Sequence, residues 1–373
     1  MSTFVLPPTH KALVQEVYGE PLVVKTVPTP QPTSGSAVIK VLYAPIVSYT
    51  RDVYNGNRKY AYIAPLVTGA SAIGRVAATG PDAALLKEGD LVYFDCTVRG
   101  RDDSDAIILM GFSHGGKEGS RKLMEGEWRD STFAEYAKLP LENLYLLDEK
   151  RLCGSPSAGG LGYAPEQLTW ILQALVPYGG LRSIGLQAGE TVIVAPATGG
   201  FGSAAVVVAL SMGARVIAMG RNADALAQFK ALGPRIETVQ MTGDVQTELE
   251  SLKKFGRIDA FFDISPRDAQ NSTHVKSAIL SLRNEGRVSL MGGFLEDLPI
   301  PHRFIMRCDI TLRGKWMYSR ADCLAFVGLL TTGALDVRKL VKVNKAFTLD
   351  EWETAFAFAA EHRGLGELVI FTP

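Results

Sequence analysis

The chain has 373 residues, of which 47% are hydrophobic and 21% are charged, a composition typical of a globular protein with roughly two domains. Lysine and arginine together number 39, as do aspartate and glutamate, so the formal net charge is zero. This balance argues against a nucleic-acid partner, because binding to phosphates usually needs a basic excess. No segment reaches the roughly 20 apolar residues that span a bilayer, and no signal-like run opens the chain, so we expect a cytoplasmic protein without a membrane partner.

The cysteines and histidines give no sign of a metal site. The four cysteines are irregularly spaced and form no C-x-x-C pair, and the five histidines form no H-x-x-x-H pair. Zinc sites and disulfide frameworks normally show regular spacings of these kinds. We therefore expect neither a metal site nor a disulfide framework.

The first part of the chain predicts a β-rich domain. A polar, glycine-rich stretch at 99–129 interrupts it, and loops of this length in a compact domain are often functional. Apolar segments separated by glycine and proline predict strands at 11–17, 37–43, 73–79, 90–94 and 132–139.

The rest of the chain alternates between strands and helices. After a helix at 164–181, we expect strands at 191–195, 214–219, 257–264 and 287–290 and helices at 202–212, 223–232 and 272–282. Apolar strands separated by helices are typical of a buried parallel sheet. The tail predicts strands at 310–317, 340–347 and 367–371 and helices at 322–330 and 350–361. We infer an α/β protein with a β-rich domain at 1–160, completed by 305–373, and a doubly wound parallel-sheet domain at 161–304.

A glycine-rich turn joins the strand at 191–195 to the next helix. Gly199 allows the backbone to approach a pyrophosphate, Gly202 allows the helix to pack against the strand, and the helix N-terminus offers free N–H groups. This strand–turn–helix context is what a dinucleotide site requires. We therefore expect a dinucleotide to be held by the whole turn, which comprises Ala197, Thr198, Gly199, Gly200, Phe201 and Gly202.

The end of the following strand predicts which dinucleotide binds. The sequence there is Gly220-Arg221-Asn222, where an NAD site places an acidic residue that bonds the adenosine ribose. A carboxylate would repel the 2′-phosphate of NADP, whereas glycine leaves room and arginine can form charge-assisted bonds with it. The three residues predict NADP(H). The alternative is that Arg221 is merely solvated and the protein accepts either cofactor.

We expect the nicotinamide near the carboxyl ends of the later strands, where ligands bind in doubly wound sheets. Ser265 follows the strand at 257–264. Gly292, Gly293 and Phe294 follow the strand at 287–290. Lys315 is a further candidate, with an ordinary surface lysine as the alternative.

Three longer segments resemble the medium-chain dehydrogenase/reductase superfamily, which includes alcohol dehydrogenases, quinone reductases and enoyl reductases. They are PLVTGASAIGRVAATG, LKEGDLVYF and LQAGETVIVAPATGGFG. The resemblance implies a GroES-like β-rich catalytic domain and a Rossmann domain with a doubly wound parallel sheet. It also allows a two-fold homodimer, which is common in the superfamily.

Zinc-dependent members of the superfamily carry Cys-His and Gly-His-Glu at two places in the catalytic domain. The resemblance aligns these with Val47-Ser48 and with Gly69-Ala70-Ser71. A catalytic zinc needs three protein ligands drawn from cysteine, histidine and carboxylate, and these positions supply none. The four-cysteine structural lobe is also missing, and residues 99–129 occupy its place. The resemblance is therefore to the zinc-free members.

Without zinc, a hydroxyl or an imidazole must stabilise or protonate charge that develops on the substrate. The loop beside the first zinc position supplies Ser48 and Tyr49 as candidate catalytic residues. His114 lies in the 99–129 stretch, and Tyr178 opens a segment that runs along the nicotinamide in the superfamily. Packing tyrosines, a solvated His114 and protonation by water are the alternatives.

These features predict an oxidoreductase that transfers hydride from NADPH to an activated C=C or C=O bond of a small apolar metabolite. A reductase is favoured because NADP(H) usually serves as a hydride donor. The alternatives are oxidation of a secondary alcohol, as in alcohol dehydrogenases, and a nucleotide-binding homologue without catalytic activity.

Overall fold

The computed structural model describes residues 5–373, which divide into two compact units. The first unit contains the residues up to Leu172 together with Asp336–Arg363 and Glu367–Pro373. The second contains Gln173–Leu335 and Gly364–Gly366. Residues 305–335 therefore lie with the second unit, whereas the sequence led us to expect them in the first.

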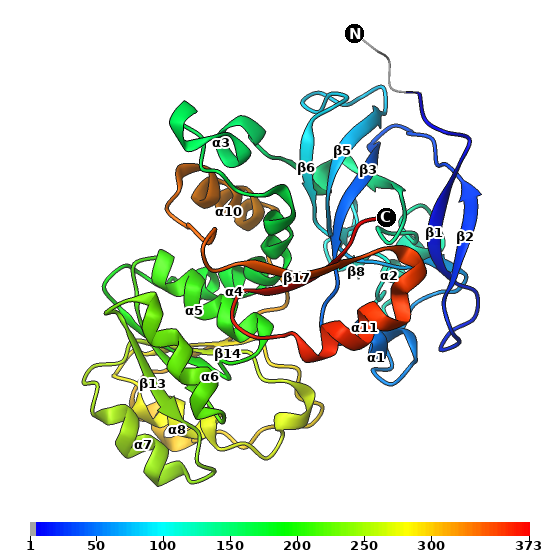
Figure 1. Ribbon diagram of the computed structural model, residues 1–373. Coiled ribbons are helices and arrows are strands. Elements are labelled where there is room, and N and C mark those ends of the chain that lie inside the picture. Colours follow the sequence, from blue (N-terminus) through cyan, green and yellow to red (C-terminus); the bar gives the residue numbers. More distant parts are fainter. Residues whose placement is uncertain (1–4) are drawn as a thin grey trace. The chain divides into compact units, whose positions relative to one another are not determined.

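The first unit is built mostly on antiparallel sheet, with one parallel pair between β17 and β18. The seven-stranded main sheet has the order β10-β6-β5-β3-β18-β17, and β9 pairs with β3. The strand β3 (Ser36–Pro45) is its centre, and Ile39 is matched by Val76 of β5 and by Ala137 of β9. The last strand of the chain, β18, pairs with β3, so the C-terminal segment joins a sheet built from the first half of the sequence (Figure 1). The other elements are β1 (Thr9–Gln15), β2 (Val23–Pro28), α1 (Thr50–Tyr54), β4 (Leu66–Val67), β5 (Ala72–Thr79), β6 (Leu91–Phe94), β7 (Thr97–Arg99), β8 (Ile107–Leu109), α2 (Glu118–Glu125), β9 (Tyr136–Pro140), β10 (Leu144–Leu146), α3 (Glu149–Cys153), β17 (Lys342–Phe347), α11 (Trp352–Glu361) and β18 (Glu367–Phe371).

The second unit is a doubly wound Rossmann domain. Its six strands are all parallel, in the order β13-β12-β11-β14-β15-β16, which is the 3-2-1-4-5-6 order of dinucleotide-binding folds. The expected α/β fold class is therefore confirmed. The elements are α4 (Ile171–Ser183), which begins at the boundary, β11 (Thr191–Ala195), α5 (Gly200–Ser211), β12 (Arg215–Gly220), α6 (Ala223–Gln228), β13 (Ile236–Gln240), α7 (Val245–Lys253), β14 (Ala260–Asp263), α8 (His274–Ser281), β15 (Arg287–Leu290), α9 (His302–Arg307), β16 (Thr311–Gly314) and α10 (Arg320–Thr332).

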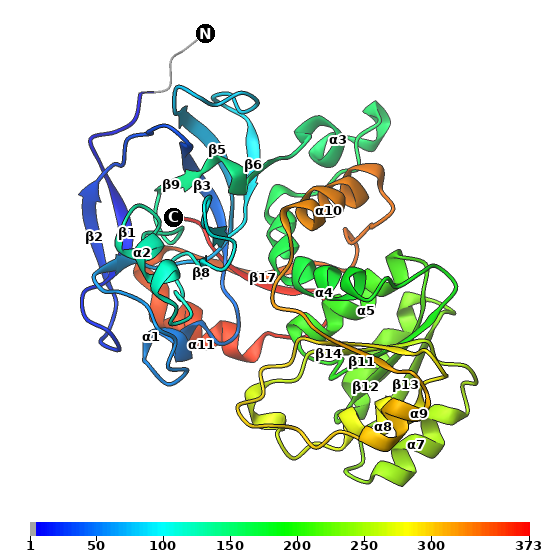
Figure 2. The same ribbon diagram turned by 180° about the vertical axis from the view of Figure 1, so that it is seen from behind.

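Helices cover both faces of this parallel sheet. One face packs on α7, α8 and α9, which contribute Leu252, Ile279 and Ile305 to a continuous apolar core. On the other face lie α4 and α5 (Figure 2). In α4 a side chain at Gly180 would lie 2.5 Å from the Phe262 ring of β14. Gly180 therefore brings that helix directly onto the sheet.

The strand β16 explains why residues 305–335 belong to the second unit. It extends the parallel sheet beyond β15, with Leu312 opposite Val288. The helix α10 that follows is held to α4 by an ion pair of 3.0 Å between Arg182 and Asp322. A sequence pattern predicts that a segment is a strand, but it does not specify which sheet the strand joins.

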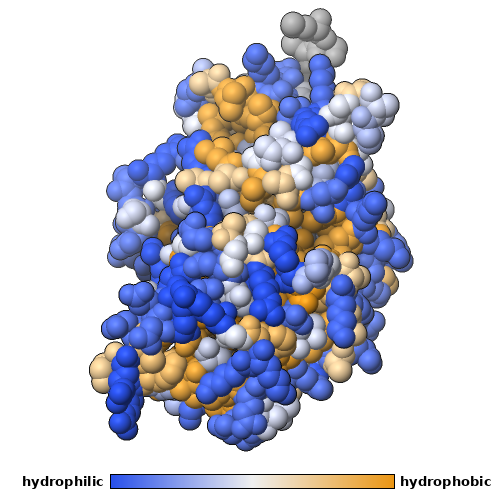
Figure 3. Space-filling model, turned by 90° about the vertical axis from the view of Figure 1, so that its left-hand side faces the viewer, coloured by the Kyte–Doolittle hydropathy of each residue, from blue (hydrophilic) through white to orange (hydrophobic). Residues whose placement is uncertain are grey.

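The surface gives no single dominant patch on the face drawn in Figure 3, where hydrophilic residues are interrupted by several separate hydrophobic areas. Scattered apolar side chains of this kind are normal on protein surfaces. No helix formed by residues 5–373 combines the length and the apolar character that crossing a bilayer would require.

Candidate functional site

The glycine-rich turn has the geometry that close approach of a phosphate requires. It leaves β11 and enters α5, whose first residue is Gly200. A side chain at Gly202 would lie 2.1 Å from the Pro196 carbonyl oxygen, so only glycine lets the helix pack this tightly on the turn. A side chain at Gly199 would meet no atom within 4 Å. The backbone at Gly199, immediately before α5, therefore borders open space.

The end of β12 lies against this turn. The Ala197 N–H donates to the Met219 carbonyl at 2.7 Å, and a side chain at Gly220 would lie 2.8 Å from the Thr198 methyl carbon. Arg221 follows on the surface, with its carbonyl oxygen accepting a 3.1 Å hydrogen bond from the Gln240 side chain. The structure thus places Gly220 against Thr198, with Arg221 next in the chain, and their contact with an adenosine stays a prediction.

Asn222 has a local structural task. Its side-chain oxygen accepts the Ala225 N–H at 3.0 Å and caps α6. Phe201, in the turn, is partly buried. Their contact with a cofactor stays a prediction.

The residues predicted around the nicotinamide follow three neighbouring strand ends. Ser265 follows β14, Gly292 and Gly293 follow β15, and Lys315 follows β16. The Ser265 hydroxyl is buried and donates a 2.5 Å hydrogen bond to Asp263, whose other oxygen accepts the Gly292 N–H at 3.0 Å. Sequence reasoning missed Asp263, although a charged residue that ends an apolar strand was a usable signal.

Two candidates near this edge have packing contacts. The Phe294 ring is partly buried and packs against the apolar core under the sheet. Tyr178, in α4, is 5% exposed and has its ring centroid 5.3 Å from that of Phe326 in α10. The Arg182 guanidinium also lies over the Tyr178 ring, 5.6 Å from its centroid. A catalytic role of Tyr178 stays a prediction.

In the first unit, Ser48 and Tyr49 form the turn before α1, and both are partly buried. The Arg58 guanidinium lies 4.0 Å above the Tyr49 ring, and the Phe112 ring lies 6.4 Å away edge-on. Burial raises the pKa of Tyr49 well above its usual value, and the nearby Arg58 charge offsets only part of that rise. The Tyr49 hydroxyl therefore keeps its proton at physiological pH, so it can act as a donor but not as a base.

His114 lies in the segment that was expected to be a long loop. That segment in fact contains a strand and a helix. Residues Ile107–Leu109 form β8 by pairing with β7, and Glu118–Glu125 form α2. The His114 N–H donates to the Ala61 carbonyl at 2.7 Å, and its Nδ1 accepts the Gly116 N–H at 3.1 Å. Burial lowers the pKa of His114, so the ring is neutral at physiological pH.

The backbone is tightly packed at Gly69, immediately before the residues Ala70 and Ser71 that align with zinc ligands of the superfamily. Gly69 has a φ of 126°, and a side chain there would lie 2.6 Å from the Thr132 nitrogen. The Gly69 N–H donates to the Tyr54 hydroxyl at 2.9 Å, and that hydroxyl donates to the Gly111 carbonyl at 2.9 Å. Among residues 5–373 no three histidine, cysteine or acidic side chains are grouped so that they could hold a metal ion. Val47, Ala70 and Ser71, which the resemblance aligns with zinc ligands, are buried residues without a thiol, imidazole or carboxylate group.

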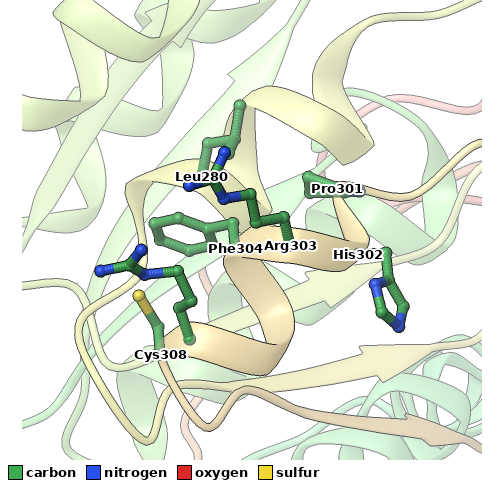
Figure 4. A pocket seen from close by; sticks show the side chains of 7 residues that line it. Leu280, Pro301, His302, Arg303, Phe304 and Cys308 are labelled. Carbon is green, nitrogen blue, oxygen red and sulfur yellow. The ribbon is translucent and has the colours of Figure 1, made fainter.

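A separate cavity of about 520 Å³ lies beside α9 in the second unit. In Figure 4 Leu280, Arg303, Phe304 and Cys308 gather around it, whereas His302 points away from them. Its lining includes none of the predicted site residues; the full set is Leu280, Pro301, His302, Arg303, Phe304, Arg307 and Cys308.

Comparison with known proteins gives consistent relatives. The chain is 25% identical to an L-threonine 3-dehydrogenase of Streptomyces coelicolor, with 96% of this chain and 98% of that protein covered. It is 26% identical to alcohol dehydrogenase 2 of Caenorhabditis elegans, with 92% and 93% covered.

Solved structures share the fold. A cobalt- and zinc-bound thermostable alcohol dehydrogenase from Pyrobaculum aerophilum has a TM-score of 0.73 at 19% identity, with 98% of this chain and 100% of that one covered. A putative zinc-binding dehydrogenase from Sinorhizobium meliloti 1021 bound to NADP has a TM-score of 0.75 at 18% identity, with 98% and 99% covered.

Two family models match the chain, one within the first unit and one within the second. Residues 33–149 match the alcohol dehydrogenase GroES-like domain, and residues 200–332 match the model described as zinc-binding dehydrogenase. The first match covers most of the β-rich unit, and the second starts at the first residue of α5. The chain belongs to the medium-chain dehydrogenase/reductase superfamily of oxidoreductases, with a GroES-like domain and a Rossmann domain.

Proposed function

We propose that this protein is a zinc-independent, NADP(H)-dependent reductase that acts on an activated C=C or C=O bond of an apolar metabolite. The observation that carries the proposal is the contact between Gly220 and Thr198, with Arg221 next in the chain. Gly220 therefore occupies the position beside the glycine-rich turn where an NAD site has a carboxylate. The Arg221 guanidinium follows one residue later. That combination suits a 2′-phosphate.

The chain's own residues supply binding and orientation for the cofactor. N–H groups at the start of α5 would hold the pyrophosphate, and Arg221 would bond the 2′-phosphate. Gly292 and Ser265 would line the nicotinamide half, with Gly293 and Lys315 beside them. When bound, NADP(H) supplies or accepts the hydride.

The first unit would supply the proton donor. The Tyr49 hydroxyl is held protonated by burial, and Ser48 is the adjacent hydroxyl. A hydrogen bond from either group to a substrate oxygen would stabilise charge that develops there. The Phe112 ring centroid lies 6.4 Å from that of Tyr49 and 6.3 Å from that of Tyr60, and these aromatic side chains favour an apolar or aromatic substrate.

Zinc independence is part of the proposal because the donor chemistry does not fit the metal. Val47 and Ala70 are buried aliphatic residues, and Ser71 is a buried serine, at the positions that the resemblance aligns with zinc ligands. The alcohol dehydrogenase from Pyrobaculum aerophilum that shares the fold is bound to cobalt and zinc, so metal analysis of this protein tests the proposal directly.

Oxidation of a secondary alcohol is the second candidate function. The relatives named alcohol dehydrogenase and L-threonine 3-dehydrogenase favour it. The same site could serve either direction of hydride transfer, so the direction is a matter of substrate.

One panel experiment tests the proposal. NADPH absorbance is followed with enones, quinones, ketones and aldehydes, and NADP⁺ reduction is followed with secondary alcohols and L-threonine. Oxidation of NADPH by an enone, quinone or carbonyl compound supports the reductase, and turnover with alcohols alone supports the second candidate. NADPH binding without any turnover favours a non-catalytic homologue. A Tyr49→Phe variant that turns over as fast as wild type would remove Tyr49 as the donor.

We also propose a homodimer in which two copies pair along β16. Within the described residues β16 is the outer strand of its sheet, and Thr311, Arg313 and Gly314 are exposed. An exposed strand edge offers unpaired N–H and C=O groups to a second copy. Sedimentation should give twice the mass of one chain, and a single-chain mass would contradict this proposal.

A further inference from the structure

The first turn of α8 is hydrogen-bonded to loops from both halves of the Rossmann sheet. In this strand order β11–β13 form the half that binds the adenosine mononucleotide, and β14–β16 form the other half. The turn begins at Thr273, which precedes α8, and includes His274 and Ser277. Each of these three side chains bonds a buried network that reaches a strand end.

The adenosine side is organised by one buried carboxylate. Glu248, in α7, has no exposed surface. It accepts the Thr273 hydroxyl at 2.8 Å and the Ser277 hydroxyl at 2.7 Å. It also accepts the N–H groups of Thr242 at 2.9 Å and Gly243 at 3.1 Å, in the loop after β13.

That loop is tied in turn to the predicted 2′-phosphate position. The Met241 N–H donates to the Gly220 carbonyl at 2.9 Å. The chain of contacts from α8 therefore passes through Glu248 to the residue that precedes Arg221.

The nicotinamide side is organised by His274, which is fully buried. Its Nε2 lies 2.8 Å from the Ser265 hydroxyl, which donates its own proton to Asp263. His274 must therefore donate from Nε2, because the Ser265 proton is already used. Its Nδ1 lies 2.6 Å from the Ser272 hydroxyl. A chain of hydrogen bonds therefore runs from Ser272 through His274 and Ser265 to Asp263.

Asp263 also links this hydrogen-bond network to the loop that follows the neighbouring strand β15. Its second oxygen accepts the Gly292 N–H, and a side chain at Gly292 would lie 2.3 Å from that oxygen. Asp263 is 1% exposed, and burying a carboxylate is costly unless hydrogen bonds satisfy it. Glu248 is therefore bonded directly by the first turn of α8, whereas Asp263 is linked to that turn through Ser265. Both carboxylates also accept backbone N–H groups of loops that follow strand ends.

We propose that the first turn of α8 is a positioning element that keeps the two halves of the NADP(H) site in register. Thr273 and Ser277 act through Glu248 on the adenosine half. His274 acts through Ser265 and Asp263 on the nicotinamide half. This inference rests on the proposed function, since it assumes that NADP(H) occupies this crevice.

The test compares two probes that differ only in the half they fill. NADPH fills both halves, whereas adenosine 2′,5′-bisphosphate carries only the adenosine half with its 2′-phosphate. Dissociation constants of both probes are measured by calorimetry for the full-length wild type and for Ser265→Ala, His274→Phe, His274→Gln and Ser277→Ala. Ser281→Ala is the matched control, because its hydroxyl bonds only the Ala278 carbonyl one turn further along the same helix.

The two sides of the turn should give different signatures. Ser265→Ala and His274→Phe should weaken NADPH binding about tenfold, as expected for a lost buried hydrogen bond, and leave the bisphosphate within about twofold. His274→Gln, which keeps a donor, should restore part of the loss. Ser277→Ala should weaken both probes by the same factor, roughly three- to tenfold. Ser281→Ala should bind both probes as wild type does.

Equal changes of both probes in Ser265→Ala and His274→Phe, or no change in either, would overturn the positioning role. Binding of neither probe by the wild type would instead overturn the proposed function. If His274→Phe does not fold, as judged by circular dichroism, Ser277→Ala decides the question, because Ser277 is not among the residues proposed to line the cofactor site; unchanged binding of both probes in that variant would overturn the positioning role.

Discussion

The two outer glycines of the cofactor turn predict opposite effects of the same substitution. A Cβ at Gly202 would lie 2.1 Å from the Pro196 carbonyl oxygen and 3.0 Å from the Ala197 carbonyl carbon, which are both backbone atoms. A Cβ at Gly199 would meet nothing within 4 Å, and the residue has an ordinary extended backbone with φ −87° and ψ 172°. Gly202→Ala must therefore push α5 away from the turn, whereas Gly199→Ala fits the free protein.

These contacts give the expected magnitudes. Overpacking of this kind costs about 1–3 kcal/mol, and we expect Gly202→Ala near the upper end because backbone atoms cannot rotate away. Gly199→Ala should raise the free energy of unfolding by about 0.4–1 kcal/mol, because it restricts the unfolded chain. Its methyl group would nevertheless occupy space that the pyrophosphate needs, so NADPH binding should weaken by at least about tenfold, or 1.4 kcal/mol.

Urea denaturation without cofactor and NADPH titration measured by fluorescence separate the two effects. Gly199→Ala should be as stable as wild type or more so and bind poorly, and Gly202→Ala should be the less stable variant. Wild-type affinity in Gly199→Ala would refute the placement of the pyrophosphate. Unchanged stability in Gly202→Ala would refute the steric argument.

Three further predictions concern other parts of the molecule. Tyr54→Phe should lower the free energy of unfolding by about 1–3 kcal/mol, because it leaves the buried Gly69 N–H and Gly111 carbonyl unsatisfied; unchanged urea stability would contradict this. Desolvation raises the pKa of Tyr62 from 10.0 to about 12. The unfolded chain therefore loses this proton at lower pH than the folded protein does, so the free energy of unfolding should fall as pH rises from 10.0 toward 12. The fall should be smaller in Tyr62→Phe, and equal falls in the variant and the wild type would disprove the assignment. Treatment with a strong zinc chelator should leave turnover unchanged and metal analysis should find less than one zinc per chain, whereas loss of turnover that zinc restores would refute zinc independence.

The parallel sheet could largely be predicted from the sequence because its central strands are short apolar runs. The expected strands at 191–195 and 287–290 coincide with β11 and β15. β13 was missed, because in its sequence IETVQ only Ile236 and Val239 are buried. The helix α7 was missed for a related reason, since it buries only one narrow stripe that includes Leu249 and Leu252.

The candidate site was predictable where one local motif carries it, and not where distant residues meet. The glycine-rich turn and Gly220-Arg221 are contiguous patterns whose spacing reflects a single βαβ unit. The bonds of Asp263 to Ser265 and Gly292, and of Ser265 to His274, join segments from three parts of the chain. The sequence also could not predict which sheet β16 joins, because the residues of a strand do not specify the strand with which it pairs.

The most direct test of the central claim is a comparison of dissociation constants for NADPH and NADH, in wild type and in Arg221→Ala. We predict that wild type binds NADPH at least about tenfold more tightly than NADH, as one charge-assisted contact with the 2′-phosphate implies. Arg221→Ala should lose this preference while its affinity for NADH stays the same. Equal wild-type affinities, tighter binding of NADH, or a preference that survives in Arg221→Ala would contradict the account.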